Sequence, residues 1–177
     1  MCGAVRWLVC EGREEDSPQT GVVETGPADV HNEVEWNSLN NNVLEIVVSS
    51  NCCNDSSVRV LDLSELKYLR HIKIGNECFE NVDEVKMTGL NVLESVEIGM
   101  NSFTKNWGND PNRHFYLKNC PKLKSLKMGR YSFSDYSVCE IENVDALEVI
   151  EMGELDKKSC NFRYASLELK SILILNK

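Results

Sequence analysis

One short motif recurs along this chain at nearly regular intervals. It reads Leu-x-x-φ-x-φ-Gly, where φ is an apolar residue, and its copies begin at Leu69, Leu93, Leu123 and Leu147. A further copy begins at Val43, with Ser49 in place of the glycine. Successive copies start 26, 24, 30 and 24 residues apart. One unit of this size cannot bury its apolar face, so the units must stack and share a continuous core.

Each copy carries two groups of alternating apolar residues. One group is the φ-x-φ segment of the motif, and a second lies upstream, as in Val85, Met87 and Leu90 before the copy at Leu93. Alternation is the spacing of a strand with one buried face, whereas no stretch keeps a helical period for three turns. We therefore expect a mainly β, leucine-rich-repeat-type parallel solenoid with about five coils, two short strands per coil and little or no helix.

The two ends of the repeat depart from this pattern. Before the first copy, the upstream group is shifted by one residue, to Val34, Trp36 and Leu39. After the last copy the upstream group recurs once more, as Leu167, Leu169 and Ile172 leading to Leu175. Because solenoids usually end in an atypical cap, we expect residues 34–177 to form a solenoid that is cut short at its C-terminus.

The segment before the repeat, residues 1–33, has a different character. The net charge of the chain is −9, and residues 1–57 carry −8 of it, so the repeat body is nearly neutral. Residues 13–33 hold two prolines and several acidic side chains, which predicts a flexible acidic linker. Residues 4–10 either form a strand that caps the first coil through Trp7 or lie apart from it. This charge balance does not favour a nucleic acid as a partner.

Two further positions of the motif predict turns and core packing. A glycine directly after the second strand suits a turn with positive φ, an expectation that Ser49 in the first copy does not meet. Three copies continue to a phenylalanine, at Phe79, Phe103 and Phe133. We expect these rings to stack as a buried aromatic column, which Phe162 continues.

The outward positions between the apolar residues alternate in charge from copy to copy. One column holds Arg70, Glu94, Lys124 and Glu148. A second column holds Lys73, Glu97, Lys127 and Glu151. On the other face of the coil, Asp62 precedes Lys86 in an equivalent column. Parallel strands in register lie about 4.8 Å apart, so neighbouring charges would pair and contribute about 0.2–1 kcal/mol each.

These columns supply the candidate partner-binding surface. Its residues are Arg70, His71, Lys73, Trp107, Lys124, Lys127 and Arg130. The cations form either a solvated face paired by neighbouring glutamates or a contact site for an acidic partner. Trp107 lies in the insertion 104–112, which makes the 30-residue interval. Its ring either folds back on the edge of the solenoid or stands exposed as an anchor, since Trp is a frequent hot-spot residue.

The chain carries no pattern typical of a catalytic or metal site. His71 is expected beside Ser95 and Ser125, the raw material of a nucleophilic site, but without an orienting carboxylate in that column. There is no phosphate-cradling glycine loop and no His-Glu-x-x-His spacing. The eight cysteines form no Cys-x-x-Cys pair, and we expect reduced core residues, with at least one disulfide as the alternative. The sequence therefore predicts no enzyme activity, no cofactor and no bound metal.

The coil around residue 123 resembles the BspA-like leucine-rich repeats. The matching residues are Cys120, Leu123, Leu126, Met128, Gly129, Ser132 and Phe133. The resemblance covers about residues 34–175, and it departs from the family where Gly follows the Leu-bearing strand directly, without a proline-containing turn. It implies a parallel β-solenoid with no catalytic residues. Members are often surface or secreted microbial proteins that bind host or matrix proteins, while many protist members have no known role.

Repeat architecture favours binding over catalysis, because it offers an extended surface without a fixed active site. We expect a protein-binding repeat domain that uses its strand-lined face, with a protein as partner. The alternative is a structural or vestigial fragment of a larger repeat array. No apolar run approaches the roughly 18 residues of a membrane span. The expected location is cytoplasmic in the absence of a clear signal peptide, or extracellular if the N-terminus is incomplete.

Overall fold

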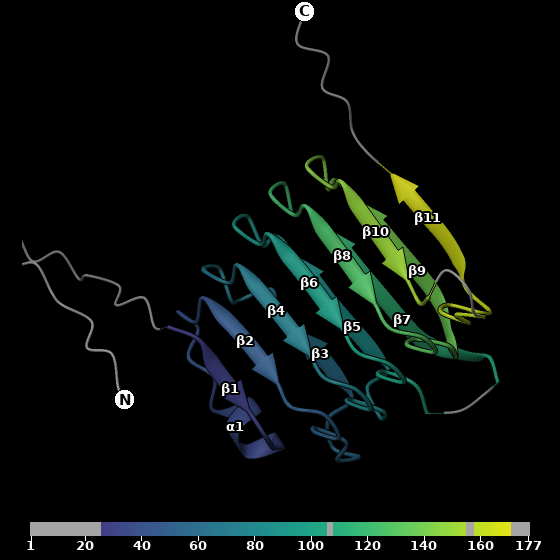
Figure 1. The fold of residues 1–177 in the computed structure, drawn as a ribbon, viewed down its shortest axis with the longest axis horizontal. Coiled ribbons are helices and arrows are strands. Elements are labelled where there is room, and N and C mark those ends of the chain that lie inside the picture. Colours follow the sequence, from purple (N-terminus) through teal and green to yellow (C-terminus); the bar gives the residue numbers. More distant parts are fainter. Residues whose placement is uncertain (1–25, 106–107, 155–157, 171–177) are drawn as a thin grey trace, which may run out of the picture.

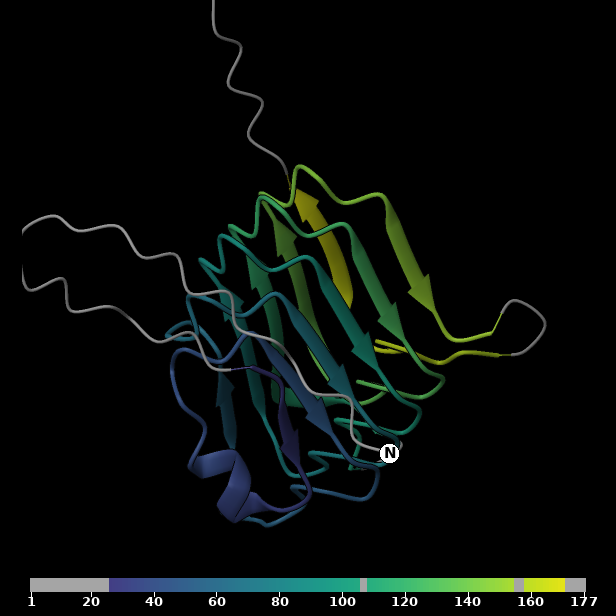
Figure 2. The ribbon, with the colours of Figure 1, turned by 60° about the vertical axis from the view of Figure 1, so that its left-hand side comes forward.

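The computed structural model describes residues 26–105, 108–154 and 158–170, which form two parallel β-sheets (Figure 1). The six-stranded sheet contains, in order, β1 (Ala28–Val30), β2 (Glu45–Val48), β4 (His71–Ile74), β6 (Ser95–Ile98), β8 (Ser125–Met128) and β10 (Val149–Met152). The five-stranded sheet contains, in order, β3 (Val60–Asp62), β5 (Glu84–Thr88), β7 (Asp110–Lys118), β9 (Tyr136–Glu142) and β11 (Ser166–Lys170). Figure 2 shows the sheets as two layers.

From β2 onward, consecutive strands alternate between the two sheets. The φ-x-φ segments of the motif form strands of the six-stranded sheet, and the upstream groups form strands of the five-stranded sheet. In β4, β6 and β8 the burial alternates with period two, so that the φ positions are buried and the intervening side chain is exposed. The expectation of a mainly β chain with parallel strands and almost no helix is confirmed.

The phenylalanines of the motif stack in the core between the sheets, as predicted. The ring centroids of Phe79 and Phe103 lie 5.2 Å apart, and those of Phe103 and Phe133 lie 4.6 Å apart, with nearly parallel planes. Phe162 continues the column at 5.0 Å from Phe133. At the other end, the ring of Trp36 meets Phe79 edge-on at 5.0 Å. The column therefore links the four copies that begin at Leu69, Leu93, Leu123 and Leu147, and it ends against the N-terminal segment.

The first copy does not have the upstream strand that the sequence predicted at Val34 and Trp36. These residues lie in the helix α1 (Glu33–Asn37), where the side chain of Asn32 accepts a hydrogen bond from Glu35 N at 3.0 Å. This N-cap and the acidic first turn favour a helix locally. On the side away from β4, β2 pairs with β1, which lies within the segment expected to be a linker. The sheet thus begins earlier along the chain than the boundary at residue 33.

The positive φ expected at the four motif glycines is not found at three of them. Among the described glycines, only Gly89 and Gly153 have positive φ. Gly75, Gly99 and Gly129 are required by close approach instead, because a Cβ at each would lie 2.5–2.6 Å from backbone or polar atoms of the preceding copy. The left-handed positions come two residues later, at Asn51, Glu77, Asn101 and Tyr131. Ser49 stands at the glycine position of the first copy, where its Oγ lies 2.7 Å from His31 Nδ1.

The residue before each phenylalanine ties one copy to the previous one. Its side chain donates to the backbone carbonyl at the glycine position of the preceding copy. The bonds join Ser102 Oγ to Gly75 O (2.8 Å), Ser132 Oγ to Gly99 O (2.6 Å), Cys78 Sγ to Ser49 O (3.1 Å) and Asn161 Nδ2 to Gly129 O (2.7 Å). Because a buried carbonyl needs a donor, this repeated bond explains why small polar side chains recur there.

The 30-residue interval is anchored by a buried arginine. Arg113 is 1% exposed, and its Nη1 lies 2.6 Å from Asp135 Oδ2. Its remaining nitrogens donate to the carbonyl oxygens of Val82 and Glu80, and its guanidinium lies 4.7 Å from the ring centre of Tyr136. The charge of the guanidinium is therefore paired, its N–H groups are hydrogen-bonded and its flat face packs against a ring. A buried charged group needs such partners. The insertion is therefore fastened to the core at the start of β7.

Candidate functional site

The solvent-facing side of the six-stranded sheet carries three parallel rows of side chains, which we call the outer face. The first row precedes the strands and holds Arg70, Glu94, Lys124 and Glu148. The middle row holds Glu45, His71, Ser95, Ser125 and Val149. The third row holds Asp29, Val47, Lys73, Glu97, Lys127 and Glu151. Three of the candidate residues, Arg70, Lys73 and Lys127, pair within these rows.

The alternating charges pair across neighbouring strands, as the sequence predicted. Arg70 Nη1 lies 3.3 Å from Glu94 Oε1. Lys73 Nζ lies 3.3 Å from Glu97 Oε1, and Lys127 Nζ lies 3.4 Å from Glu151 Oε2. These side chains are about half exposed, so each pair contributes at most about 1 kcal/mol and weakens with added salt. The pairs fix the register of the sheet while leaving their charged groups accessible to a partner.

His71 lies in the middle row, beside Ser95 as expected. Its Nδ1 lies 2.9 Å from Ser95 Oγ, and Ser125 follows Ser95 on the next strand. The expectation that this row holds no carboxylate is wrong, because Glu45 of β2 aligns with His71. The sequence carries this signal, since Glu45 stands two residues into the first copy, where His71 stands in the second.

The backbone amide of Ser95 in this Glu-His-Ser row is already bonded within the sheet. Acyl transfer needs donors directed at the oxyanion that forms beside the nucleophile. The backbone N–H of Ser95 donates to the carbonyl oxygen of Arg70 (3.2 Å), and the neighbouring amides pair across the sheet. No amide of that residue is left to stabilise an oxyanion at Ser95.

The other three candidate residues are Arg130, Lys124 and Trp107. Arg130 belongs to the turn after β8, where its Nε donates to Lys158 O at 3.3 Å and its Nη2 donates to the hydroxyl of Tyr131 at 2.8 Å. Lys124 lies in the first row, between the strands of Glu94 and Glu148. Trp107 is outside the described residues, so its position relative to the outer face stays a prediction. The structure thus brings together five of the candidates, Arg70, His71, Lys73, Lys124 and Lys127.

Several lysines that lie close together in the sequence form a linear basic patch, which the fold divides between the two sheets. They are Lys118, Lys122, Lys124 and Lys127. Lys118 ends β7 in the five-stranded sheet, where its Nζ pairs with Glu140 and lies 3.6 Å from Glu142 Oε2. Hydrogen bonding to Glu140 raises the pKa of Lys118. Lys124 and Lys127 belong to the outer face of the other sheet. The linear basic patch therefore does not form one basic surface.

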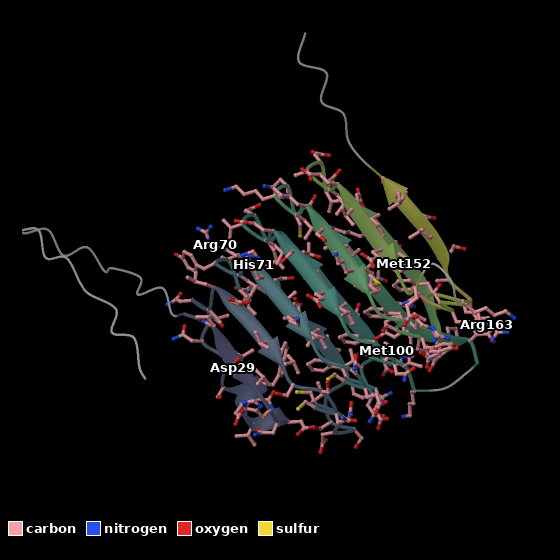
Figure 3. All side chains as sticks on the ribbon, viewed as in Figure 1. Asp29, Arg70, His71, Met100, Met152 and Arg163 are labelled. Carbon is pink, nitrogen blue, oxygen red and sulfur yellow. The ribbon has the colours of Figure 1, made fainter. Side chains whose placement is uncertain are left out.

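A shallow hollow lies at the carboxyl edge of the outer face, and the sequence did not reveal it. It has a volume of about 350 Å³ and is lined in part by Glu97, Met100, Lys127, Glu151 and Gly153. Met100 is 41% exposed. Figure 3 shows Arg70 and His71 at the amino ends of the strands and Met100 and Met152 at the carboxyl ends. The outer face therefore runs from a row of alternating charges at the amino ends of the strands to a hollow beside the thioether of Met100.

A metal-binding cluster and a membrane-spanning helix are both absent from the described part of the chain. Within it, no three His, Cys, Asp or Glu side chains come close enough together to hold a metal ion. None of its helices has the length and apolar character needed to cross a bilayer. The six cysteines of these residues are free thiols, and five of them are buried. Burial raises the pKa of the Cys53 and Cys139 thiols to about 12, so they are not reactive thiolates.

Comparison of the chain with protein-family models, with curated proteins and with solved structures returned no match.

Proposed function

We propose that this chain is a non-catalytic, leucine-rich-repeat-type solenoid of about five coils that binds a protein through the outer face. The solenoid is supported by the strict alternation of strands between two parallel sheets and by the lateral bonds between equivalent positions of successive copies. The resemblance of the repeat to BspA-like repeats, whose members include binders of host or matrix proteins, points the same way.

One observation carries the binding proposal. The outer face is an uninterrupted, in-register parallel sheet whose exposed side chains are charged on both sides of a middle row rich in hydrogen-bonding groups. Because the charges alternate, the face is close to neutral and suits a protein surface of mixed charge better than a uniformly charged polymer. Flat, extended surfaces of this kind are the usual binding sites of repeat proteins.

The test compares partner capture by matched variants. Lys73→Glu with Lys127→Glu reverses two half-exposed cations of the outer face, whereas Lys86→Glu reverses a cation on the outer side of the five-stranded sheet. Each immobilised protein is offered lysate from its source cells, and the retained proteins are quantified by mass spectrometry. Proteins retained by wild type and Lys86→Glu, but lost from the double variant, support the proposal.

Equal retention by all three proteins contradicts binding through the outer face. Far-UV circular dichroism of each variant controls for loss of fold. If wild type retains nothing above a blank resin, the alternative gains support, namely a structural unit of a larger repeat array with no binding of its own. No reaction is assigned to the chain in either case, because the Glu45–His71–Ser95 row has no oxyanion donor from Ser95.

A further inference from the structure

The C-terminal end of the two sheets exposes apolar side chains that every other copy buries. Leu167 and Leu169 of β11 are 50% and 58% exposed. Their register partners on β9, Cys139 and Ile141, are 0% and 1% exposed. These leucines hold core positions of the pattern, and among the described residues no strand lies beyond β11 to cover them.

The six-stranded sheet ends in the same way. Ile150 of β10 is 40% exposed, whereas its register partner Leu126 is fully buried. In the part of the chain that the structure describes, β10 and β11 are the last strands of their sheets, so each presents an unpaired backbone edge. Such an edge beside exposed core residues is a ready site for pairing with another strand.

The opposite end of the sheets is closed. Val30 of β1 and Leu61 of β3 occupy the first inward positions, and they are 0% and 1% exposed. Trp36, which follows β1 in the helix α1, packs edge-on against Phe79. Among the described residues, the exposed core positions on the terminal strands therefore lie at the C-terminal side, which we call the open end.

We propose that the open end pairs with the open end of a second copy of this chain, in a two-fold symmetric dimer. Continued head-to-tail stacking would place like charges together in both sheets. In the third row of the outer face, Glu151 of one copy would meet Asp29 of the next. In the five-stranded sheet, the row that begins at Asp62 ends at Glu168, so these two carboxylates would also meet.

The tail-to-tail arrangement removes this repulsion. When β11 pairs antiparallel with β11 of a second copy about Leu169, each Glu168 faces a Lys170, and the two Leu169 side chains meet on the inner side. Glu168 and Lys170 already lie on one face of the strand, with Lys170 Nζ 2.5 Å from Glu168 Oε2. Opposite charges directly across an antiparallel pair are favourable, and a two-fold axis lets one patch complement itself.

The mass of the intact 177-residue chain in solution tests this dimer. Sedimentation velocity should show a species of about 40 kDa, twice the 20.1 kDa protomer, at concentrations of about 10–100 µM. Leu169→Lys should give a monomer over the same range. The matched control is Val60→Lys, which changes a 52% exposed apolar residue on the edge strand at the closed end and should leave the dimer intact.

Charge reversal gives a second measurement that does not depend on the apolar contact. Glu168→Lys should weaken dimerisation about ten-fold, because two symmetry-related pairs become repulsive. Adding Lys170→Glu to that variant should restore the wild-type dissociation constant. A wild-type monomer at 100 µM overturns the proposal, as does a dimer that survives Leu169→Lys but not Val60→Lys.

The other occupant to separate is the chain's own segment 171–177. The shortened chain that ends at Lys170 distinguishes the two, since it keeps β11 and the exposed leucines. If a second copy covers the open end, the shortened chain dimerises at least as well as wild type. A wild-type monomer whose shortened form dimerises would show that segment 171–177 covers the end, and the proposal would be wrong.

Discussion

Ser102 Oγ donates a 2.8 Å hydrogen bond to the carbonyl oxygen of Gly75, one copy of the motif earlier. The same hydroxyl accepts a bond from the backbone N–H of Cys78 at 3.2 Å. Ser102 is fully buried, so water cannot replace either bond. One short side chain thus ties two successive turns of the chain together.

Ser102→Ala should lower the free energy of unfolding by about 1–3 kcal/mol, because it leaves a buried carbonyl and a buried amide without their partner. Ser102→Cys should cost less, since Cys78 makes the equivalent bond from its thiol in the preceding copy. Urea denaturation followed by circular dichroism measures both. Ser56→Ala, at an exposed position, serves as the control, and an equal loss in that variant would contradict the hydrogen-bond argument.

Gly99→Ala should destabilise the chain by about 2–3 kcal/mol through overpacking. A Cβ at Gly99 would lie 2.5 Å from Asn76 Oδ1 and 2.5 Å from the carbonyl carbon of Gly75. The second of these atoms is backbone and cannot move aside without displacing the neighbouring copy. Gly108→Ala is the matched control, because nothing lies within 4 Å of its Cβ position. Thermal unfolding should separate the two variants, and similar melting temperatures would refute the close-approach explanation.

Glu77→Asn should raise the free energy of unfolding by about 0.5–1 kcal/mol. Glu77 has φ of +58°, a left-handed conformation that asparagine adopts more readily. The equivalent residues of the neighbouring copies, Asn51 and Asn101, are already asparagines with φ of 58° and 55°. Chemical denaturation gives the stability. Glu65→Asn, at an exposed position outside the left-handed set, should change it by less than about 0.5 kcal/mol.

Alkaline pH should weaken the fold through Cys139. Burial raises the pKa of this thiol from 9.0 to about 12. A raised pKa in the folded state means that the contribution to stability is complete below pH 9 and is lost as the pH rises toward 12. The unfolding free energy of wild type should therefore fall relative to that of Cys139→Val between pH 9 and pH 12. Parallel curves for the two proteins would show that the thiol does not carry the effect.

The regular part of this protein could be predicted because its sequence repeats. Apolar alternation identified the strands of both sheets, and the charge columns gave the register that pairs Lys73 with Glu97 and Lys127 with Glu151. Each of these inferences compares equivalent positions of several copies. An irregular residue in one copy therefore does not obscure the pattern that the other copies share. The same comparison located the phenylalanine column.

The predictions failed where the chain departs from its own repeat. The upstream group of the first copy lies in α1, because Asn32 caps a helix there. Glu45 was missed beside His71, although it holds the same position in its own copy. The hollow at Met100 could not be foreseen, since it depends on how far the turns of four copies separate at the sheet edge.

The sequence by itself determined the strand spacing, the two-sheet alternation and the paired charges, because these follow from which positions recur and with what polarity. Only the tertiary structure decided why the motif needs glycine, which lysines share a face and which core positions are exposed on the last described strands. Those properties depend on distances between copies, such as the 2.5 Å approach of a Gly99 Cβ to the backbone of Gly75, and on burial at the last strand. A sequence pattern contains neither the distances between copies nor the burial of the last strand. Equivalent residues in the middle and at the end of a stack have the same pattern.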